Sequence, residues 1–147
     1  MIYQGSARTP VREAILHCAA IRTGQFDGMR AFQVFATINR WHKERGFNSF
    51  GYHALIMPDG HIYSGRPFTK QGAHVLGHNR GTLGILLIEK QKIEEIREFS
   101  DYYTPNQRYA LRDLLRSVHG IGKVSGHNDY AAKLCPGFKV QSEDWLE

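Results

Sequence analysis

A histidine and a cysteine lie eight residues apart in the segment from His127 to Phe138, which reads His-Asn-Asp-Tyr-Ala-Ala-Lys-Leu-Cys-Pro-Gly-Phe. Imidazole and thiolate are ligands that suit Zn²⁺. Two ligands do not make a metal site, so a third must come from elsewhere in the chain, and His17 is the best candidate. Two nitrogens and one sulfur with an open fourth position are typical of a catalytic zinc site, not of a structural one. The spacing of His127 and Cys135 alone is a weak signal for a metal site, and Cys135 before a Pro-Gly pair is also compatible with a plain turn, so both interpretations stay open at this point.

The elements that must position these residues follow from hydrophobic patterning. The apolar run from Ala14 to Ala20 predicts a buried strand that carries His17. Neighbouring side chains of a strand point to opposite faces, so a His17 that faces the site leaves Cys18 facing the core as a small buried residue. The same alternation separates Tyr52 from His53, of which only one can share the face of the site.

The remaining elements alternate between helices and strands, with one hairpin. In the first half of the chain, the pattern predicts a helix over 28–45, capped by Asp27 and ended by Gly46, followed by a hairpin of strands over 52–57 and 61–64 with a turn at 59–60. A long loop over 65–80 then leads to a strand over 82–89. In the last part, the pattern predicts a helix that begins with a capping box at 104–107 and ends at Gly120, a strand over 123–127, and a turn or helix after Gly137. We therefore expect an α/β fold, a single domain over residues 1–147 with a central mixed β-sheet flanked by helices.

Length and composition narrow the class of protein. A chain of 147 residues with 41% hydrophobic residues is expected to form one globular domain. No apolar run approaches the ~18 residues of a membrane span, and the N-terminal region lacks the core of a signal peptide, so synthesis in the cytoplasm is expected. A disulfide between the two cysteines is not expected there. The net charge of +5 favours an acidic partner such as nucleic acid, anionic lipid or a cell-wall polymer, and charge alone does not choose among them.

Several polar residues are expected to lie on the surface or to support packing, without a role in a site. Arg108, Arg112 and Arg116 recur every four residues and predict a stripe on one helix face, most simply a solvated face. The stretch 89–101 mixes both signs of charge and predicts solvated surface. Most of the eight histidines are expected to be bystanders. Among these, we expect a surface or packing role for His42 and exposure for His61 and His119.

Eight short motifs occur in a specific order along the chain. They are 16–20 (Leu-His-Cys-Ala-Ala), 40–47 (Arg-Trp-His-Lys-Glu-Arg-Gly-Phe), 51–53 (Gly-Tyr-His), 58–60 (Pro-Asp-Gly), 65–66 (Gly-Arg), 72–74 (Gly-Ala-His), 81–85 (Gly-Thr-Leu-Gly-Ile) and 133–138 (Lys-Leu-Cys-Pro-Gly-Phe). In this order they resemble the zinc-dependent N-acetylmuramoyl-L-alanine amidases, whose fold is shared with peptidoglycan recognition proteins. The resemblance spans roughly residues 14–146, and the stretch 21–30 departs from it.

The resemblance implies an enzyme that hydrolyses the amide bond between N-acetylmuramic acid and L-alanine in peptidoglycan. Many bacterial members have an aspartate in place of Cys135, so the Cys-Pro-Gly form points to the small lysozyme-like amidases of phages. A phage relative also binds the RNA polymerase of its phage, which no motif supports for this chain. The residues that the resemblance implies are the zinc ligands His17, His127 and Cys135, the catalytic residues Tyr52 and Lys133, and His74 in the substrate groove.

The chemistry of amide hydrolysis agrees with these residues. Zinc can lower the pKa of bound water toward ~7 and polarise the carbonyl. Lys133, two residues before a ligand, could stabilise the oxyanion, and Tyr52 can hydrogen-bond the water or the oxyanion or relay a proton. The sequence does not divide these roles between the two side chains. A cysteine ligand makes zinc a weaker Lewis acid, so a nearby lysine becomes more useful.

Several functions remain open at this stage. We expect a monomeric phage endolysin that acts on peptidoglycan or muropeptides, has no separate cell-wall-binding domain, and reaches the wall only after the membrane is permeabilised. A cytosolic muropeptide-recycling amidase would look similar, and Cys135 favours the endolysin. An endopeptidase that cuts within the stem peptide needs similar zinc chemistry. A non-catalytic peptidoglycan-binding module is disfavoured because the ligand and catalytic residues are all present, and nucleic-acid binding rests on charge alone.

Overall fold

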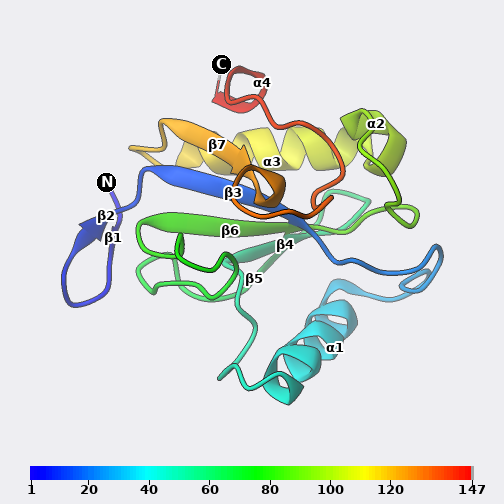
Figure 1. Ribbon diagram of the computed structural model, residues 1–147, viewed down its shortest axis with the longest axis horizontal. Coiled ribbons are helices and arrows are strands. Elements are labelled where there is room, and N and C mark those ends of the chain that lie inside the picture. The colour runs from blue at the N-terminus through cyan, green and yellow to red at the C-terminus, as the bar shows by residue number, and fades with distance from the viewer. Residues whose placement is uncertain (147) are drawn as a thin grey trace.

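A five-stranded mixed β-sheet forms the centre of the fold in the computed structural model, which describes residues 1–146 (Figure 1). The strand order is β5-β4-β6-β3-β7, in which β4, β6, β3 and β7 run parallel and β5 pairs antiparallel with β4. The strands are β3 (Glu13–Cys18), β4 (Ala54–Ile56), β5 (Ile62–Ser64), β6 (Thr82–Leu87) and β7 (Lys123–Gly126). The predicted α/β fold with a mixed sheet is confirmed.

Helices cover both faces of this sheet. Helix α1 (Ala31–Glu44) lies against one face and helix α3 (Pro105–Ser117) against the other (Figure 1). The smaller elements are the ribbon of β1 (Tyr3–Gln4) and β2 (Thr9–Pro10), the helices α2 (Phe99–Tyr102) and α4 (Glu143–Leu146), and the 3₁₀ turn η1 (His127–Asp129). Within residues 1–146, no helix has both the length and the apolar character needed to cross a membrane.

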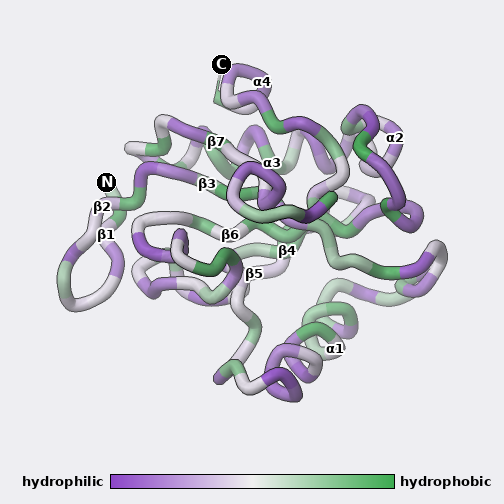
Figure 2. Tube along the Cα trace, in the orientation of Figure 1, coloured by the Kyte–Doolittle hydropathy of each residue, from purple (hydrophilic) through white to green (hydrophobic). Residues whose placement is uncertain are grey.

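Alternation along the strands divides the interior into two hydrophobic cores. In β6, Ile85 packs in the core that contains Leu111 of α3, whereas Leu86 packs in the core that contains Val34 of α1. Figure 2 shows hydrophobic residues along the middle of the sheet and hydrophilic ones in the outer loops. Burial on both faces explains why this strand reads as a continuous apolar run in the sequence.

Helix α1 begins later than predicted, at Ala31, and the prediction of Asp27 as its N-cap is wrong. Gly28 has a φ angle of +76°, a left-handed conformation that a right-handed helix cannot include. The first turn forms after Arg30, whose backbone N–H donates to the side-chain oxygen of Gln33 at 2.8 Å. The glycine-rich turn therefore delays the helix.

Helix α3 begins as predicted, but its arginine face is not simply solvated. The N–H of Gln107 donates to the hydroxyl of Thr104 at 3.1 Å, and the N–H of Thr104 donates to the side-chain oxygen of Gln107 at 2.9 Å. The Arg108 guanidinium lies 4.6 Å from the ring centroid of Phe99 and 5.3 Å from that of Trp145. Helices α2 and α4 thus cover the start of the arginine stripe.

The stretch 89–101 is not uniformly surface, so that expectation is wrong at Glu89 and at Phe99. Glu89 is only 3% exposed, and Phe99, in α2, is 6% exposed and belongs to the core beneath α3. The charged residues between these two positions are exposed, as predicted. The apolar strand that precedes Glu89 carries it into the interior.

Candidate metal centre and groove

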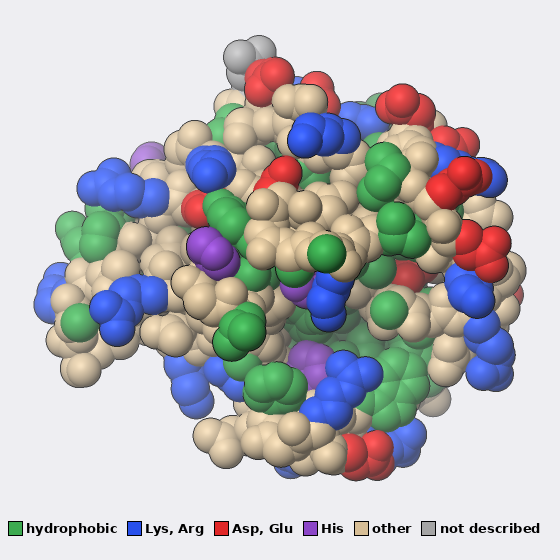
Figure 3. All heavy atoms as spheres, in the orientation of Figure 1, with side chains coloured by type: hydrophobic (Ala, Val, Ile, Leu, Met, Phe, Trp, Pro, Cys, Tyr) green, Lys and Arg blue, Asp and Glu red, His purple; other side chains and the backbone are tan. Residues whose placement is uncertain are grey.

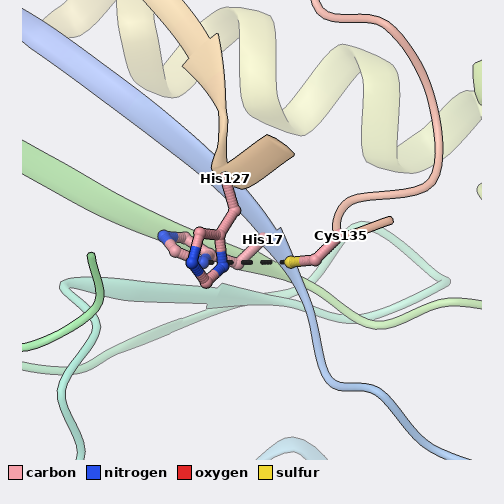
Figure 4. A group of neighbouring side chains, drawn as sticks. All are labelled: His17, His127 and Cys135. Atoms are coloured by element: carbon pink, nitrogen blue, oxygen red, sulfur yellow. Dashed lines mark hydrogen bonds between the residues drawn. The ribbon is translucent and has the colours of Figure 1, made fainter. Parts of the chain in front are cut away.

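Three side chains, one from β3 and two from the segment after β7, converge at the carboxyl ends of the parallel strands (Figure 4). His17 lies near the end of β3, His127 opens η1 directly after β7, and Cys135 lies in the loop beyond η1. Their ligand atoms all lie within 4.8 Å of one another. The Sγ of Cys135 is 4.0 Å from the Nδ1 of His17. Two such ligands at ~2.0 and ~2.3 Å from one tetrahedral zinc would be about 3.5 Å apart.

Hydrogen bonds hold the loop that carries Cys135 against the rest of the fold. The N–H of Asn128 donates to the carbonyl of Cys135 at 2.9 Å. The buried Tyr103 donates its hydroxyl to the carbonyl of Pro136 at 2.7 Å. The sulfur itself accepts the backbone N–H of Cys18 at 3.1 Å. The thiol is therefore fixed by its own loop and by the end of β3.

The charge states of the cluster suit a divalent cation. A hydrogen bond from the Cys18 thiol, with further ones from His127 and His17, holds the pKa of Cys135 well below its usual value despite burial. Burial lowers the pKa of His17, so its imidazole is neutral. A thiolate together with neutral imidazole is the kind of donor set that zinc binds. The residues present therefore fit the zinc ion that their types imply.

Cys18 is buried as expected, with 6% exposure, but it does not lie on the far face from the site. It is the last residue of β3, where strand alternation ends, and it lines the same groove as Cys135. The hydrogen bond to Cys135, together with burial, raises the pKa of the Cys18 thiol. Both cysteines are free.

Tyr52 and Lys133 lie in the walls of the groove that His127 and Cys135 also line. The Tyr52 ring meets the His17 ring edge-on, with centroids 5.0 Å apart. Burial raises the pKa of Tyr52, so its hydroxyl keeps its proton at neutral pH. Lys133 is exposed, and its positive charge adds to the effect of burial in lowering the pKa of His17. The structure thus places a proton donor and a cation beside the ligand cluster.

The groove over the cluster has a volume of about 630 Å³, within the range of small-molecule sites. Figure 3 shows the hollow between the sheet and α1, with hydrophobic and histidine side chains inside and Lys or Arg side chains at its rim. Phe47 and Leu76 line it and are 44% and 97% exposed. Arg45 also lines it. The groove therefore offers both apolar and basic contacts.

His74 lines the same groove, but both of its ring nitrogens have partners inside the protein. Its Nδ1 lies 2.9 Å from the Nε2 of His17, and its Nε2 lies 3.2 Å from the Oγ1 of Thr82. Burial, with the nearby His17, lowers the pKa of His74 to about 2, so the ring is neutral. A hydrogen bond from a substrate to His74 would have to displace one of these partners.

Two other histidines have structural partners next to the groove. Tyr52 shares the face of the site, whereas His53 is fully buried behind it, and its Nδ1 accepts the N–H of Gly84 at 3.0 Å. His42 is 8% exposed and packs in the groove wall, where its Nδ1 accepts the N–H of Gly51 at 2.9 Å. Exposed, as predicted, are His61 and His119.

Glu89 is a site-supporting residue that the sequence interpretation missed. Its carboxylate accepts the N–H groups of Ala19 and Ala20 at 2.9 Å each, and that of Ile21 at 3.4 Å. Ala20 has a φ angle of +59°, a left-handed conformation that is rare outside glycine. Glu89 therefore fixes the turn after β3, where Ala19 and Ala20 line the groove. The apolar strand that runs straight into Glu89 was the available signal.

A comparison with protein families matches residues 7–138 to the family described as N-acetylmuramoyl-L-alanine amidase. Curated relatives include the endolysin of Enterobacteria phage T3, which is 32% identical over 149 residues that cover 98% of this chain and 91% of the relative. The endolysin of Escherichia phage T7 is 33% identical over 137 residues that cover 90% of this chain and 83% of the relative. These matches extend over almost the whole chain.

Solved structures similar to this chain include an amidase and peptidoglycan recognition proteins. The N-acetylmuramoyl-L-alanine amidase LysC from Clostridium intestinale has a TM-score of 0.69 and 27% identity, with 92% of this chain and 82% of that chain covered. Peptidoglycan recognition protein LE, in complex with tracheal cytotoxin, has a TM-score of 0.69 and 27% identity, with 88% and 75% covered. Bumblebee PGRP-SA has a TM-score of 0.75 at 24% identity, with 100% and 87% covered, and shows likeness of fold alone.

Proposed function

The chain belongs to the N-acetylmuramoyl-L-alanine amidase family and hydrolyses amide bonds of peptidoglycan, and we propose that it does so with a zinc ion held by His17, His127 and Cys135. The observation that carries this proposal is the convergence of two imidazoles and a thiolate, one from β3 and two from the segment that follows β7. Three protein ligands leave the fourth position for water or substrate, as in catalytic zinc sites.

The two side chains beside the ligands suit the steps of the reaction. When bound, the metal supplies a Lewis acid and a water of lowered pKa. Tyr52, protonated and next to His17, can donate a hydrogen bond to the attacking water or to the carbonyl oxygen. Lys133 brings a positive charge to the oxygen that becomes negative when the carbonyl is attacked. We propose these two residues as the catalytic ones.

The biological role that the relatives support is that of a phage endolysin. The related recognition protein LE is in complex with tracheal cytotoxin, a monomeric diaminopimelic acid-type peptidoglycan, which supports muropeptide binding in the corresponding groove here. We propose that the protein acts as a monomer and a single catalytic domain, is made in the cytoplasm, and reaches the wall once the membrane is permeabilised.

Metal analysis of two cysteine variants tests the ligand assignment. Cys135→Ser should lose bound zinc and hydrolysis of peptidoglycan, because serine is a poor zinc ligand. Cys18→Ser is the matched control, since Cys18 lies in the same groove without being a proposed ligand, and it should retain zinc. Full zinc occupancy and full activity in Cys135→Ser would contradict the assignment.

A further inference from the structure

The two ring nitrogens of His17 face different partners. Its Nδ1 is 4.0 Å from the Sγ of Cys135, on the side of the ligand cluster, and its Nε2 is 2.9 Å from the Nδ1 of His74. A hydrogen bond between two neutral imidazoles needs a proton on only one of the two facing nitrogens. The direction of that bond therefore decides which nitrogen of His17 is free to bind a metal.

The contacts of the other ring nitrogen of His74, Nε2, set the direction of the hydrogen bond between His74 and His17. The Nε2 of His74 lies 3.2 Å from the hydroxyl of Thr82, and that hydroxyl also lies 2.9 Å from the carbonyl of His78 and 3.1 Å from the carbonyl of Asn79. Carbonyl oxygens only accept, so the single hydroxyl proton of Thr82 goes to one of them, and its oxygen accepts from His74. His74 thus carries its proton on Nε2 and offers the lone pair of Nδ1 to the Nε2–H of His17.

The backbone around His74 is shaped to hold its ring in place. A Cβ on Gly72 would lie 2.7 Å from a ring carbon of His74, and a Cβ on Gly84 would lie 2.6 Å from another. Neither distance is tolerated between such atoms, so both positions must be glycine for the ring to lie between them. The N–H of His74 also donates to the side-chain oxygen of Asn79 at 2.8 Å. The ring is therefore clamped, and it is not a loosely placed groove residue.

We propose that His74 is a positioning residue for the metal centre, which acts through His17 by fixing its tautomer and ring orientation so that Nδ1 faces the ion. This inference rests on the proposed zinc function and assigns His74 a role other than hydrogen-bonding the substrate. Ligand histidines usually donate their second N–H to a carboxylate, a carbonyl or water, and loss of that partner typically costs 10–100-fold in metal affinity. Here the acceptor is a second histidine whose own tautomer is set by Thr82.

Zinc affinity, measured by competition with a chromophoric chelator, tests this role without reference to activity. His74→Ala should weaken zinc binding by roughly 10–100-fold. His74→Asn retains an acceptor near the position of Nδ1 and should bind zinc close to the parent level. His61→Ala removes an exposed histidine outside the groove and is the matched control. A substrate-binding role would instead raise KM in His74→Ala at unchanged zinc affinity, and that result would overturn the inference.

A spectroscopic measurement on the parent protein tests the inference even if the variants do not fold. In the zinc-loaded parent protein, nitrogen-15 NMR of the imidazoles should find the metal on Nδ1 of His17 and a slowly exchanging proton on Nε2. Thr82→Val removes the hydroxyl acceptor and should speed the exchange of that proton. Zinc on Nε2 of His17 would overturn the inference alone. Failure of the parent to bind zinc would overturn both this inference and the proposed function.

Discussion

Removal of the Lys133 side chain is expected to reduce the rate of hydrolysis and to leave the fold intact. Lys133 is exposed, and its ammonium group makes no hydrogen bond or ion pair with any other residue in the described part of the chain, 1–146. The free energy of unfolding of Lys133→Ala should therefore stay within about 0.5 kcal/mol of the parent value. Because Lys133 is not a proposed ligand, its zinc content should equal that of the parent.

The expected loss of rate follows from where the charge lies. Lys133 lines the groove two residues before the proposed ligand Cys135. Besides burial, its positive charge lowers the pKa of His17, so the charge reaches the ligand cluster. Loss of a donor that stabilises a developing oxyanion costs about 10²–10³ in kcat, which corresponds to ~2.7–4 kcal/mol. The assay is the initial rate on a soluble muropeptide, where kcat should fall far more than KM changes, since the stabilisation appears only in the transition state.

Two further variants make this result interpretable. Lys139→Ala removes the same charge a few residues beyond Cys135, where its ammonium nitrogen lies 4.0 Å from Asp129, and it should match the parent rate. Lys133→Arg keeps the charge and should recover part of the lost rate. The reasoning is refuted if Lys133→Ala hydrolyses the muropeptide within about twofold of the parent, or if Lys139→Ala loses as much.

Three other variants test the site and its support. Tyr52→Phe removes one hydroxyl and keeps the ring against His17, so kcat should fall with no change in thermal unfolding; an unchanged kcat would remove Tyr52 from the mechanism. Gln107→Leu leaves the N–H of Thr104 and the carbonyl of Ile88 without their partner and should cost about 2–6 kcal/mol of stability in chemical denaturation. Burial raises the pKa of Glu89 in the folded protein, so its protonation stabilises the fold below the ordinary value near 4.5, and this contribution is lost as pH rises through the raised pKa. The stability advantage of the parent over Glu89→Gln should therefore shrink from pH 4 toward neutral pH, and a widening advantage would contradict that pKa shift.

Much of the fold could be predicted because its signals are local. The capping box at Thr104 fixes the start of α3, and the continuous apolar run of β6 indicates a strand buried on both faces. The start of α1 could not be predicted from Asp27. A glycine such as Gly28 can adopt either a left-handed or a right-handed φ, so its presence in the sequence does not say that φ is left-handed there.

In the candidate site, the ligands could be predicted from the sequence, but the residues that hold them in place could not. Donor chemistry and the family resemblance pointed to His17, His127 and Cys135, which the structure brings together. The partners of these ligands come from distant segments, and no spacing reveals them. The hydroxyl of Thr82 orients His74, and the carboxylate of Glu89 holds the turn after β3. Such contacts depend on the register between strands, which a single sequence does not specify.

Product analysis of digested peptidoglycan tests the central claim most directly. Purified sacculi should be incubated with the zinc-loaded protein, with the chelated protein, and with the chelated protein after zinc is restored, and the products should be identified by mass. The proposed function predicts release of stem peptides with a new amino terminus on L-alanine, loss of this release on chelation, and its return with zinc. New termini within the stem peptide, or undiminished release from a protein shown to be free of metal, would contradict it.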